Sequence, residues 1–356
     1  MAGGLRLLMD FNRRLLADIR GMRGTLRSDP ERLLTLQGAQ SAVCGRRQGA
    51  PACVIERAFR MNGLAAPRQI LLATDLGSRC DRALDRAVLC AREWRSELVA
   101  LTVIEPGSGA SPYRTASLAN GCRDDLSPRT RAEQRLRADL AYEDFPLAAR
   151  VELGSVVDTI LAVAKADASE LVVTGVARSE ALSRILLGST VDALARACPV
   201  PLLVVRSRPR APYARVVVAT DFSEPSRRAL EVAATFFPDA DLTLFHAFGN
   251  AFPTLAGVDL MEARSTAREE AEREAAAFLK HCALPTPVRE RVRLMMACGD
   301  AGLLLHEHGT KHPADLLVLG TQQRRGVMGL LIGSAAERIL ELAENDVLVV
   351  PPAPAA

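Results

Sequence analysis

Short apolar runs alternate with amphipathic stretches along the chain from residue 70 onward. In the first half, the runs that read as strands are too short for helices and nearly lack polar positions, and they span 70–74, 98–104, 150–153, 171–174 and 202–205. The amphipathic stretches between them predict helices at 79–94, 128–142, 156–166 and 189–197. Strands without alternation, flanked by such helices, indicate a parallel sheet that is covered on both faces.

The second half of the chain repeats the first half at an almost constant offset. The run Ile70–Asp75 returns as Val216–Asp221, 146 residues later, and Leu171–Gly175 returns as Leu316–Gly320, 145 residues later. The order of strands and helices repeats as well, with a long charged helix predicted at 258–282. A constant offset over the whole unit predicts a duplicated domain, because a chance motif would not extend so far. We expect domains at 66–207 and 212–352, after an N-terminal extension of residues 1–65.

Each copy is expected to form a doubly wound, five-stranded parallel sheet of the Rossmann-like α/β class. Ligands of such sheets bind beyond the carboxyl ends of the strands, where the winding direction reverses. The polar and glycine residues that both copies share lie at those ends: Asp75 and Asp221 follow the first strand, and Gly175 and Gly320 end the fourth.

Composition excludes several functional classes. No stretch approaches 18 uninterrupted apolar residues, and the net charge of +3 gives no argument for nucleic acid. None of the three lysines follows a glycine, which excludes the phosphate loop of the common ATPases. The eight cysteines show no CxxC spacing and read as reduced thiols, and no signal peptide is evident, so we expect a cytoplasmic protein.

The extension differs from the rest of the chain in charge. Residues 1–65 hold eleven arginines and five acidic residues, a net charge of +6. Apolar residues at 8, 11, 15, 19 and 22 share one helical face, and arginines repeat on another. Such a helix packs on its own domain, or it lies on an anionic membrane or a partner protein.

A phosphate site is predicted in each copy at a helix start. Gly188-Ser189-Thr190 and Gly333-Ser334-Ala335 each open a helix, whose free N–H groups and dipole attract phosphate. Asp75 or Asp221 would accept hydrogen bonds from a ribose hydroxyl. The same residues have an ordinary interpretation, because Gly-Ser caps helices and Asp follows strands in turns.

The sequence Ala-Thr-Asp, followed by an Arg-Ala-Leu helix and by a glycine with Gly-Ser thirteen residues later, resembles the universal stress protein family. The resemblance covers about 67–206 and 212–352. It implies sheets of strand order 3-2-1-4-5 and, in the ATP-binding branch of the family, the motif G-x2-G-x9-G-[ST]. That motif falls on Gly175, Arg178, Gly188 and Ser189, and again on Gly320, Gln323, Gly333 and Ser334. The middle glycine is therefore replaced in both copies. Arg178 can pair with phosphate, whereas Gln323 can only hydrogen-bond to it.

The resemblance implies ATP or AMP as the ligand, with Mg²⁺ accompanying ATP. In the first copy the nucleotide-binding residues would be Ala73, Thr74, Asp75, Val103, Gly175, Arg178, Gly188, Ser189 and Thr190. In the second copy they would be Ala219, Thr220, Asp221, Gly320, Gln323, Gly333, Ser334 and Ala335. The last strand of each copy is an apolar edge, so we expect the copies to pair as a pseudo-dimer within one chain, and two chains can dimerise in the same way.

Catalysis finds little support. No GxSxG nucleophile elbow occurs, and no histidine lies in the first 245 residues. His246 reads as structural or as adjacent to the ligand. His306, His308 and His312 have the spacing of a metal site, but they run into Pro313, so we predict no metal site.

Two functions remain. The first is a universal stress protein that senses or carries adenine nucleotide. The alternative is a scaffold that binds no nucleotide and acts through edge strands and partner proteins. We expect no enzyme beyond weak ATP hydrolysis, or autophosphorylation of Ser189, Thr190 or Ser334.

Overall fold

The computed structural model describes residues 65–77, 81–106, 127–140, 145–176, 188–248, 260–311, 314–322 and 333–353. The predicted helix of the extension, Arg178 and Gln323 lie outside these ranges. In the first domain the elements are β1 Gln69–Ala73, α4 Asp81–Trp94, β2 Glu97–Ile104, α5 Pro128–Leu140, β3 Leu147–Leu153, α6 Val156–Ala166, β4 Leu171–Gly175, α7 Ser189–Ala197 and β5 Leu202–Val205. In the second domain they are β6 Arg215–Ala219, α8 Glu224–Phe236, β7 Asp241–Phe248, α9 Leu260–His281, α10 Thr286–Arg291, β8 Arg293–Cys298, α11 Ala301–Lys311, β9 Leu316–Gly320, α12 Ser334–Leu342 and β10 Asp346–Val350.

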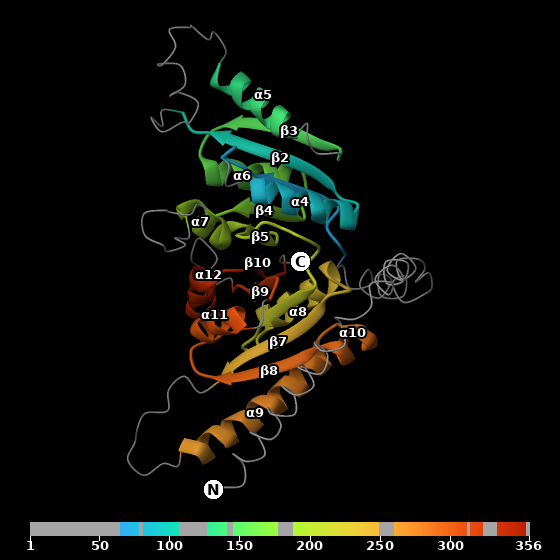
Figure 1. The fold of residues 1–356 in the computed structure, drawn as a ribbon, viewed down its shortest axis with the longest axis vertical. Helices are drawn as coiled ribbons and strands as arrows, with labels where there is room; N and C mark the ends of the chain where they lie inside the picture. The colour runs from blue at the N-terminus through green and yellow to red at the C-terminus, as the bar shows by residue number, and fades with distance from the viewer. Residues whose placement is uncertain are drawn as a thin grey trace, which may run out of the picture. The chain divides into compact units, whose positions relative to one another are not determined.

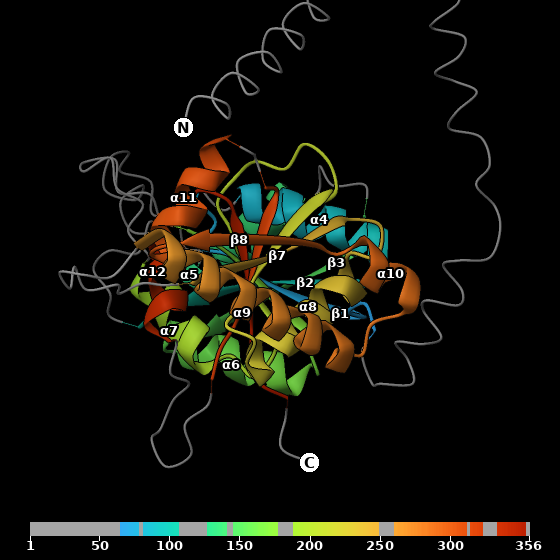
Figure 2. The same ribbon diagram turned by 90° about the horizontal axis from the view of Figure 1, so that it is seen from below.

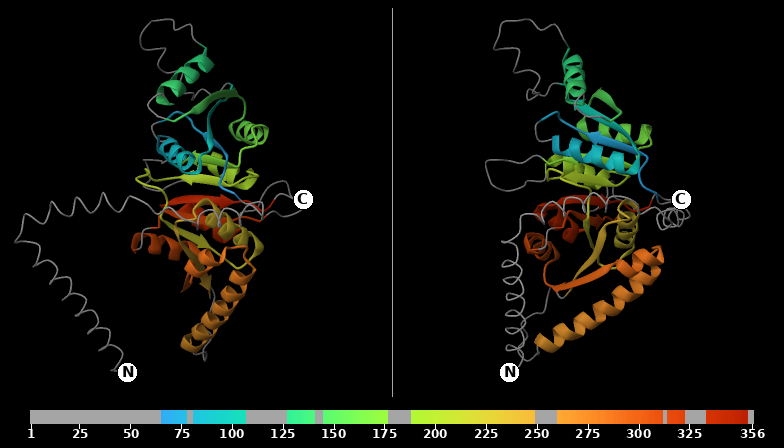
Figure 3. Two further views of the ribbon diagram at one scale, coloured as in Figure 1. Left: turned by 90° about the vertical axis from the view of Figure 1, so that its right-hand side faces the viewer. Right: turned by 45° about the vertical axis from the view of Figure 1, so that its right-hand side comes forward.

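The strands form one ten-stranded sheet of order β3-β2-β1-β4-β5-β10-β9-β6-β7-β8 (Figure 1). Within each domain all neighbours are parallel and the strand order is 3-2-1-4-5, as the resemblance to the universal stress protein family implies. The second domain adds the short helix α10 before β8, which the sequence reading missed. The predicted pseudo-dimer is present, because the edge strands β5 and β10 pair antiparallel, with Leu203 opposite Leu348 (Figure 3).

Helices cover both faces of the sheet, and neighbouring strand residues point to opposite faces. Ile70 and Leu72 belong to the core beneath α4, α5, α8, α9 and α10, whereas Leu71 and Ala73 belong to the core beneath α6, α7, α11 and α12. Both positions must therefore be apolar, which explains why the strand runs show no alternation. Figure 2 shows the strands enclosed between the helices.

The two domains also touch through their helices. On one face the indole N–H of Trp94 in α4 donates to the carbonyl of Phe236 at 2.9 Å, and the two rings lie 5.4 Å apart. On the other face Arg196 of α7 pairs with Glu337 of α12 at 2.6 Å and with Asp192 of its own helix at 3.0 Å. Side-chain contacts on both faces thus reinforce the strand pairing.

A buried ionic cluster lies at the junction of the domains. Asp346 at the start of β10 is 1% exposed and accepts hydrogen bonds from the main-chain N–H groups of Arg206 and Ser207 at 2.8 and 2.9 Å. The Tyr213 hydroxyl donates to the same carboxylate at 2.6 Å, and Arg86 of α4 lies 3.5 Å from it. The Arg86 guanidinium also stacks 3.8 Å above the Tyr213 ring. This carboxylate therefore ties the first domain and the linker to the second domain.

Candidate functional site

The loop after the first strand has the same conformation in both domains. In the second domain the Phe222 N–H donates to the Thr220 hydroxyl at 2.9 Å, and the Ser223 N–H donates to the Asp221 carboxylate at 3.1 Å. The Ser223 hydroxyl donates to the same carboxylate oxygen. Phe222 adopts a left-handed φ of 61°, which is unusual for a residue with a bulky side chain. The threonine and the aspartate thus hold a tight turn that leads into α8.

The first domain repeats this turn with its own residues. The Leu76 N–H donates to the Thr74 hydroxyl at 3.1 Å, and the Gly77 N–H donates to Asp75 at 2.8 Å. Leu76 has a φ of 56°. One oxygen of each predicted ribose-binding carboxylate is therefore engaged in its own turn, as the ordinary interpretation of these aspartates holds.

The glycines that precede α7 and α12 have no packing role of their own. Gly188 and Gly333 have φ values of −61° and −60°, which any residue adopts, and among the described residues a Cβ atom at either position would meet nothing within 4 Å. The first intrahelical bonds run from Asp192 to Gly188 and from Glu337 to Gly333, at 3.1 and 2.9 Å. The preceding N–H groups of each helix have no partner within the helix and point beyond its start.

Gly320 at the end of β9 is required by packing. A Cβ atom there would lie 2.3 Å from the carbonyl oxygen of Pro225 and 2.9 Å from the amide nitrogen of Ser226. The backbone at the start of α8 thus crosses directly over β9. This glycine therefore brings α8 close to the switch point, whatever the site binds.

A cavity of about 250 Å³ lies at this point of the second domain. Of the eight residues predicted in this copy, six line it, namely Ala219, Thr220, Asp221, Gly320, Gly333 and Ala335. Ser334 lies in the first turn of α12 but not in the lining, and Gln323 lies outside the described residues. The remaining lining comes from β7, β9, α8, α11, α12 and the loops beside them. Its apolar members are Pro225, Phe245, Ala247, Ala301, Leu319, Ala336 and Ile339, and its polar members are Ser223, Ser226, His246 and Gln322.

His246 also lines this cavity, although the sequence analysis left open whether it is structural or adjacent to the ligand. Its Nδ1 lies 2.8 Å from the Thr220 carbonyl oxygen, which can only accept, so Nδ1 carries a proton and donates it. The ring stacks on Phe222 with a centroid distance of 4.3 Å and an angle of 26°. The signal in the sequence was its position at the end of a strand beside the crevice.

The described cavity lining holds one carboxylate, Asp221, and no lysine or arginine. Just outside the lining, Asp300 caps α11 and pairs with Arg338 of α12 at 3.1 Å. The N–H of Leu303 is the main cause that holds the Asp300 pKa below its usual value, and Arg338 adds to the effect. Attraction for an anion in this lining therefore comes from the N-terminus of α12.

In the first domain the predicted residues surround the equivalent switch point. β1 lies next to β4, with Ala73 opposite Thr174, and Gly175 ends β4 one residue later. Val103 lies near the end of β2, and Ser189 and Thr190 form the first turn of α7. Arg178 lies outside the described residues. The topology therefore brings the described members of this set to one end of the sheet.

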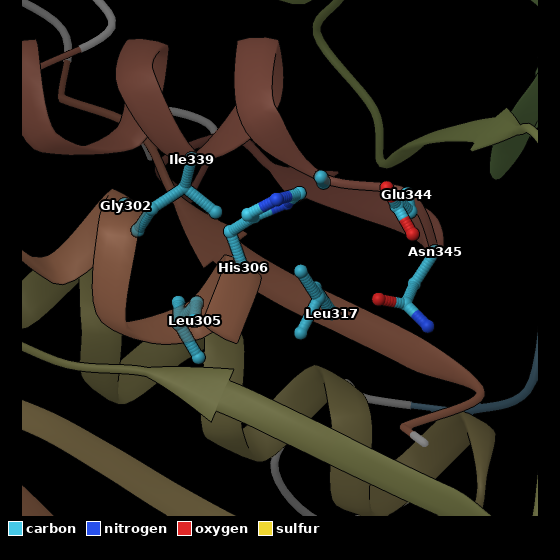
Figure 4. A pocket seen from close by; sticks show the side chains of 8 residues that line it. Gly302, Leu305, His306, Leu317, Ile339, Glu344 and Asn345 are labelled. Atoms are coloured by element: carbon cyan, nitrogen blue, oxygen red, sulfur yellow. The ribbon is translucent and has the colours of Figure 1, made fainter. Parts of the chain in front are cut away.

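The histidines of α11 lie apart from this cavity. His306 donates from Nδ1 to the carbonyl of Leu342 at 3.2 Å and lines a separate cavity of about 30 Å³ beside Leu317 and Ile339 (Figure 4). The side chain of His308 and all of His312 lie outside the described residues. No group of three metal-ligating side chains occurs in the part of the chain that the structure describes.

Comparison with known proteins identifies the family of both domains. The sequence profile of the universal stress protein family matches residues 67–206 and 212–351. The chain belongs to this family. Its members include a universal stress protein of Mycolicibacterium smegmatis, which is 26% identical over 80% of this chain and 97% of its own length. A universal stress protein of Mycobacterium tuberculosis is 30% identical over 51% of this chain and 61% of its own length.

Solved structures share the tandem fold of this universal stress protein. A protein of unknown function from Pseudomonas aeruginosa covers 82% of this chain and 95% of its own, with 22% identity and a TM-score of 0.59. A universal stress protein of Archaeoglobus fulgidus covers 80% of this chain, with 17% identity and a TM-score of 0.51. A universal stress protein in complex with cAMP covers 40% of this chain and 98% of its own, with 22% identity and a TM-score of 0.29, so it does not share the tandem arrangement. No described helix has the length and apolar character that a membrane crossing needs.

Proposed function

We propose that this universal stress protein binds an adenine nucleotide, ATP or AMP, in the cavity of its second domain and acts as a sensor or regulator in the cytoplasm. The observation that carries the proposal is the start of α12. Gly333 is free of packing and conformational constraint, and it lies where the unpaired N–H groups of the helix meet the cavity. A glycine at such a place leaves room for a phosphate group to approach the backbone.

The remaining lining fits a nucleoside. Phe245, Leu319 and Ile339 provide an apolar surface for a base, and Asp221 retains an oxygen for a ribose hydroxyl. With ATP, Mg²⁺ would be held mainly by the phosphates. We propose binding rather than catalysis: the hydroxyl of Ser223 donates to the Asp221 carboxylate, but both groups are engaged in the turn that leads into α8.

A test uses calorimetric titration of ATP, AMP and cAMP into the full chain and into the variant Gly333→Trp. The indole would fill the space at the start of α12, and the open surroundings of Gly333 leave the fold intact. We expect saturable binding that Gly333→Trp weakens at least tenfold, while Gly188→Trp, the matched change in the first domain, retains the second-domain site. Flat titrations at millimolar nucleotide would refute the proposal.

The alternative is a scaffold that binds no nucleotide. It is favoured by the turn role of Asp221 and by the absence of a cationic side chain from the described lining. Since β5 and β10 already pair within the chain, an intermolecular dimer would use another surface, such as the outer edges β3 or β8. Mass spectrometry of ligand extracted from the purified, denatured protein distinguishes the two functions, because a sensor would release adenine nucleotide.

A further inference from the structure

The imidazole of His246 is fixed in one orientation at the edge of the cavity. Nδ1 donates to the Thr220 carbonyl and Phe222 stacks against the ring, so one nitrogen and one ring face are engaged. A proton that the ring gains or loses must therefore be carried by Nε2. In the neutral ring Nε2 accepts hydrogen bonds, and in the charged ring it donates them.

The first domain has no counterpart of this group. The N–H of Thr74 donates to Leu101, as the N–H of Thr220 donates to Phe245, so the next residues, Thr102 and His246, correspond. Thr102 is 1% exposed and carries no titratable group. Leu76 likewise replaces Phe222, and the ring stack is thus a feature of the second domain alone.

Few other charged groups lie in the described surroundings of His246. Asp221, at the end of the same turn, is the acidic residue of the described cavity lining. From α8 and α9, charged and titratable residues line a neighbouring groove to which Phe222 also contributes, namely Glu224, Arg227, Glu274 and His281. From α11, Asp300 is paired with Arg338, and the neighbouring strand β8 places Met296 opposite His246.

We propose that His246 makes anion binding in the second domain dependent on pH, a role that rests on the proposed nucleotide site. With a neutral ring the described lining carries the net negative charge of Asp221, which opposes a phosphate. With a charged ring this charge is balanced, and Nε2 is the ring nitrogen left to donate a hydrogen bond. Histidine side chains ordinarily change charge between pH 5 and 8. Binding of an anion is therefore stronger at pH 5.5 than at pH 8.

The test is calorimetric titration of cAMP at pH 5.5 and pH 8. The phosphodiester of cAMP keeps one charge over this range, so the ligand adds no pH dependence of its own. We expect binding on the order of tenfold tighter at pH 5.5, which is the effect of one added charge close to the anion near a protein surface. His246→Asn removes the titrating ring while its amide replaces the donor to Thr220, and it should give equal affinity at both pH values.

His281→Asn is the matched control. His281 also donates from Nδ1 to a main-chain carbonyl, that of Ala277 at 2.7 Å, but it lies outside the cavity. This variant should keep the pH dependence of the unmodified protein. His246→Gln, which places its amide near the Nε2 position, serves if His246→Asn does not fold, as judged by circular dichroism.

The outcomes separate this inference from the function on which it rests. A pH dependence that persists in the folded His246 variant refutes the inference alone. Equal affinity at both pH values in the unmodified protein also refutes the inference alone. The same holds if the protein binds ATP but not cAMP. Flat titrations with every nucleotide at both pH values refute the proposed function, and the inference falls with it.

Discussion

Replacing Asp346 by alanine tests whether the buried ionic cluster holds the two domains together. The change removes the acceptor of two main-chain N–H groups and of the Tyr213 hydroxyl, and it leaves the guanidinium of Arg86, whose side chain is 6% exposed, without its carboxylate. Removing one partner of a buried ion pair costs about 3–5 kcal/mol, and the orphaned donors favour the upper end. Since globular domains unfold at about 5–15 kcal/mol, the loss is a large fraction of the total.

Urea unfolding followed by circular dichroism measures this loss. In the double variant Arg86→Met/Asp346→Ala the unpaired cation is absent as well, so we expect a free energy of unfolding about 1–3 kcal/mol higher than in Asp346→Ala alone. Arg268→Ala is the control, because its ion pair with Glu272 on α9 is exposed and contributes about 0.5 kcal/mol or less. An Asp346→Ala protein within about 1 kcal/mol of this control, or a double variant less stable than Asp346→Ala, would refute the reasoning.

Three further predictions follow from the described side chains. Gly320→Ala should lower the midpoint of thermal unfolding by several degrees, because its Cβ atom would overlap the backbone of α8, whereas the same change at Gly333 should shift it little. Burial raises the pKa of the Cys90 thiol to about 12, so iodoacetamide at pH 8 should modify Cys90 only after unfolding, as mapped by mass spectrometry. The pKa of Asp315 is lowered: burial raises it, but the side chain and backbone of Arg215 outweigh burial. Its stabilisation is therefore complete above its ordinary pKa of 3.8 and is lost as the pH falls below it, so Asp315→Asn should lower the thermal midpoint at pH 7 but not at pH 2.5.

The succession of parallel strands and helices was predictable from the sequence because its determinants are local and repeated, whereas the strand order followed only from the resemblance to the universal stress protein family. Runs such as Leu171–Gly175 are apolar at every position since both of their faces are buried, and that property identifies a parallel strand without reference to distant residues. The duplication then supplied two independent observations of each element. The short helix α10 escaped prediction because its six residues, Thr286–Arg291, carry one buried side chain, Val288, and no helical periodicity.

The candidate site was predictable in part for a related reason. Comparing the copies identified residues that both retain, and five of these line the second-domain cavity, namely Ala219, Thr220, Asp221, Gly320 and Gly333. The comparison could not reveal His246, which only one copy carries. Nor could it show that Gly320 and Gly333 have different roles, since the distinction depends on the approach of α8 to β9 in space.

The contacts between the domains explain why a comparison of copies fails at this junction. Two identical subunits around a two-fold axis would make every contact between two residues twice, once in each direction, but a single chain is free to change one copy only. The offsets of the repeat give the equivalent position of each residue in the other copy. The equivalent of Arg86 is Val232, that of Asp346 is Pro201, and that of Arg196 is Glu341. Arg86, Asp346 and Arg196, which make polar contacts between the domains, therefore lack a counterpart, whereas the paired strands β5 and β10 keep theirs, with Leu203 opposite Leu348. By contrast Arg82 and Arg228 do correspond, and each donates within its own domain to the carbonyl that follows its last strand, at 3.1 and 3.0 Å. Sequence symmetry is thus retained inside the domains and in the paired edge strands, and it is lost at the polar contacts that Arg86, Asp346 and Arg196 make between the domains.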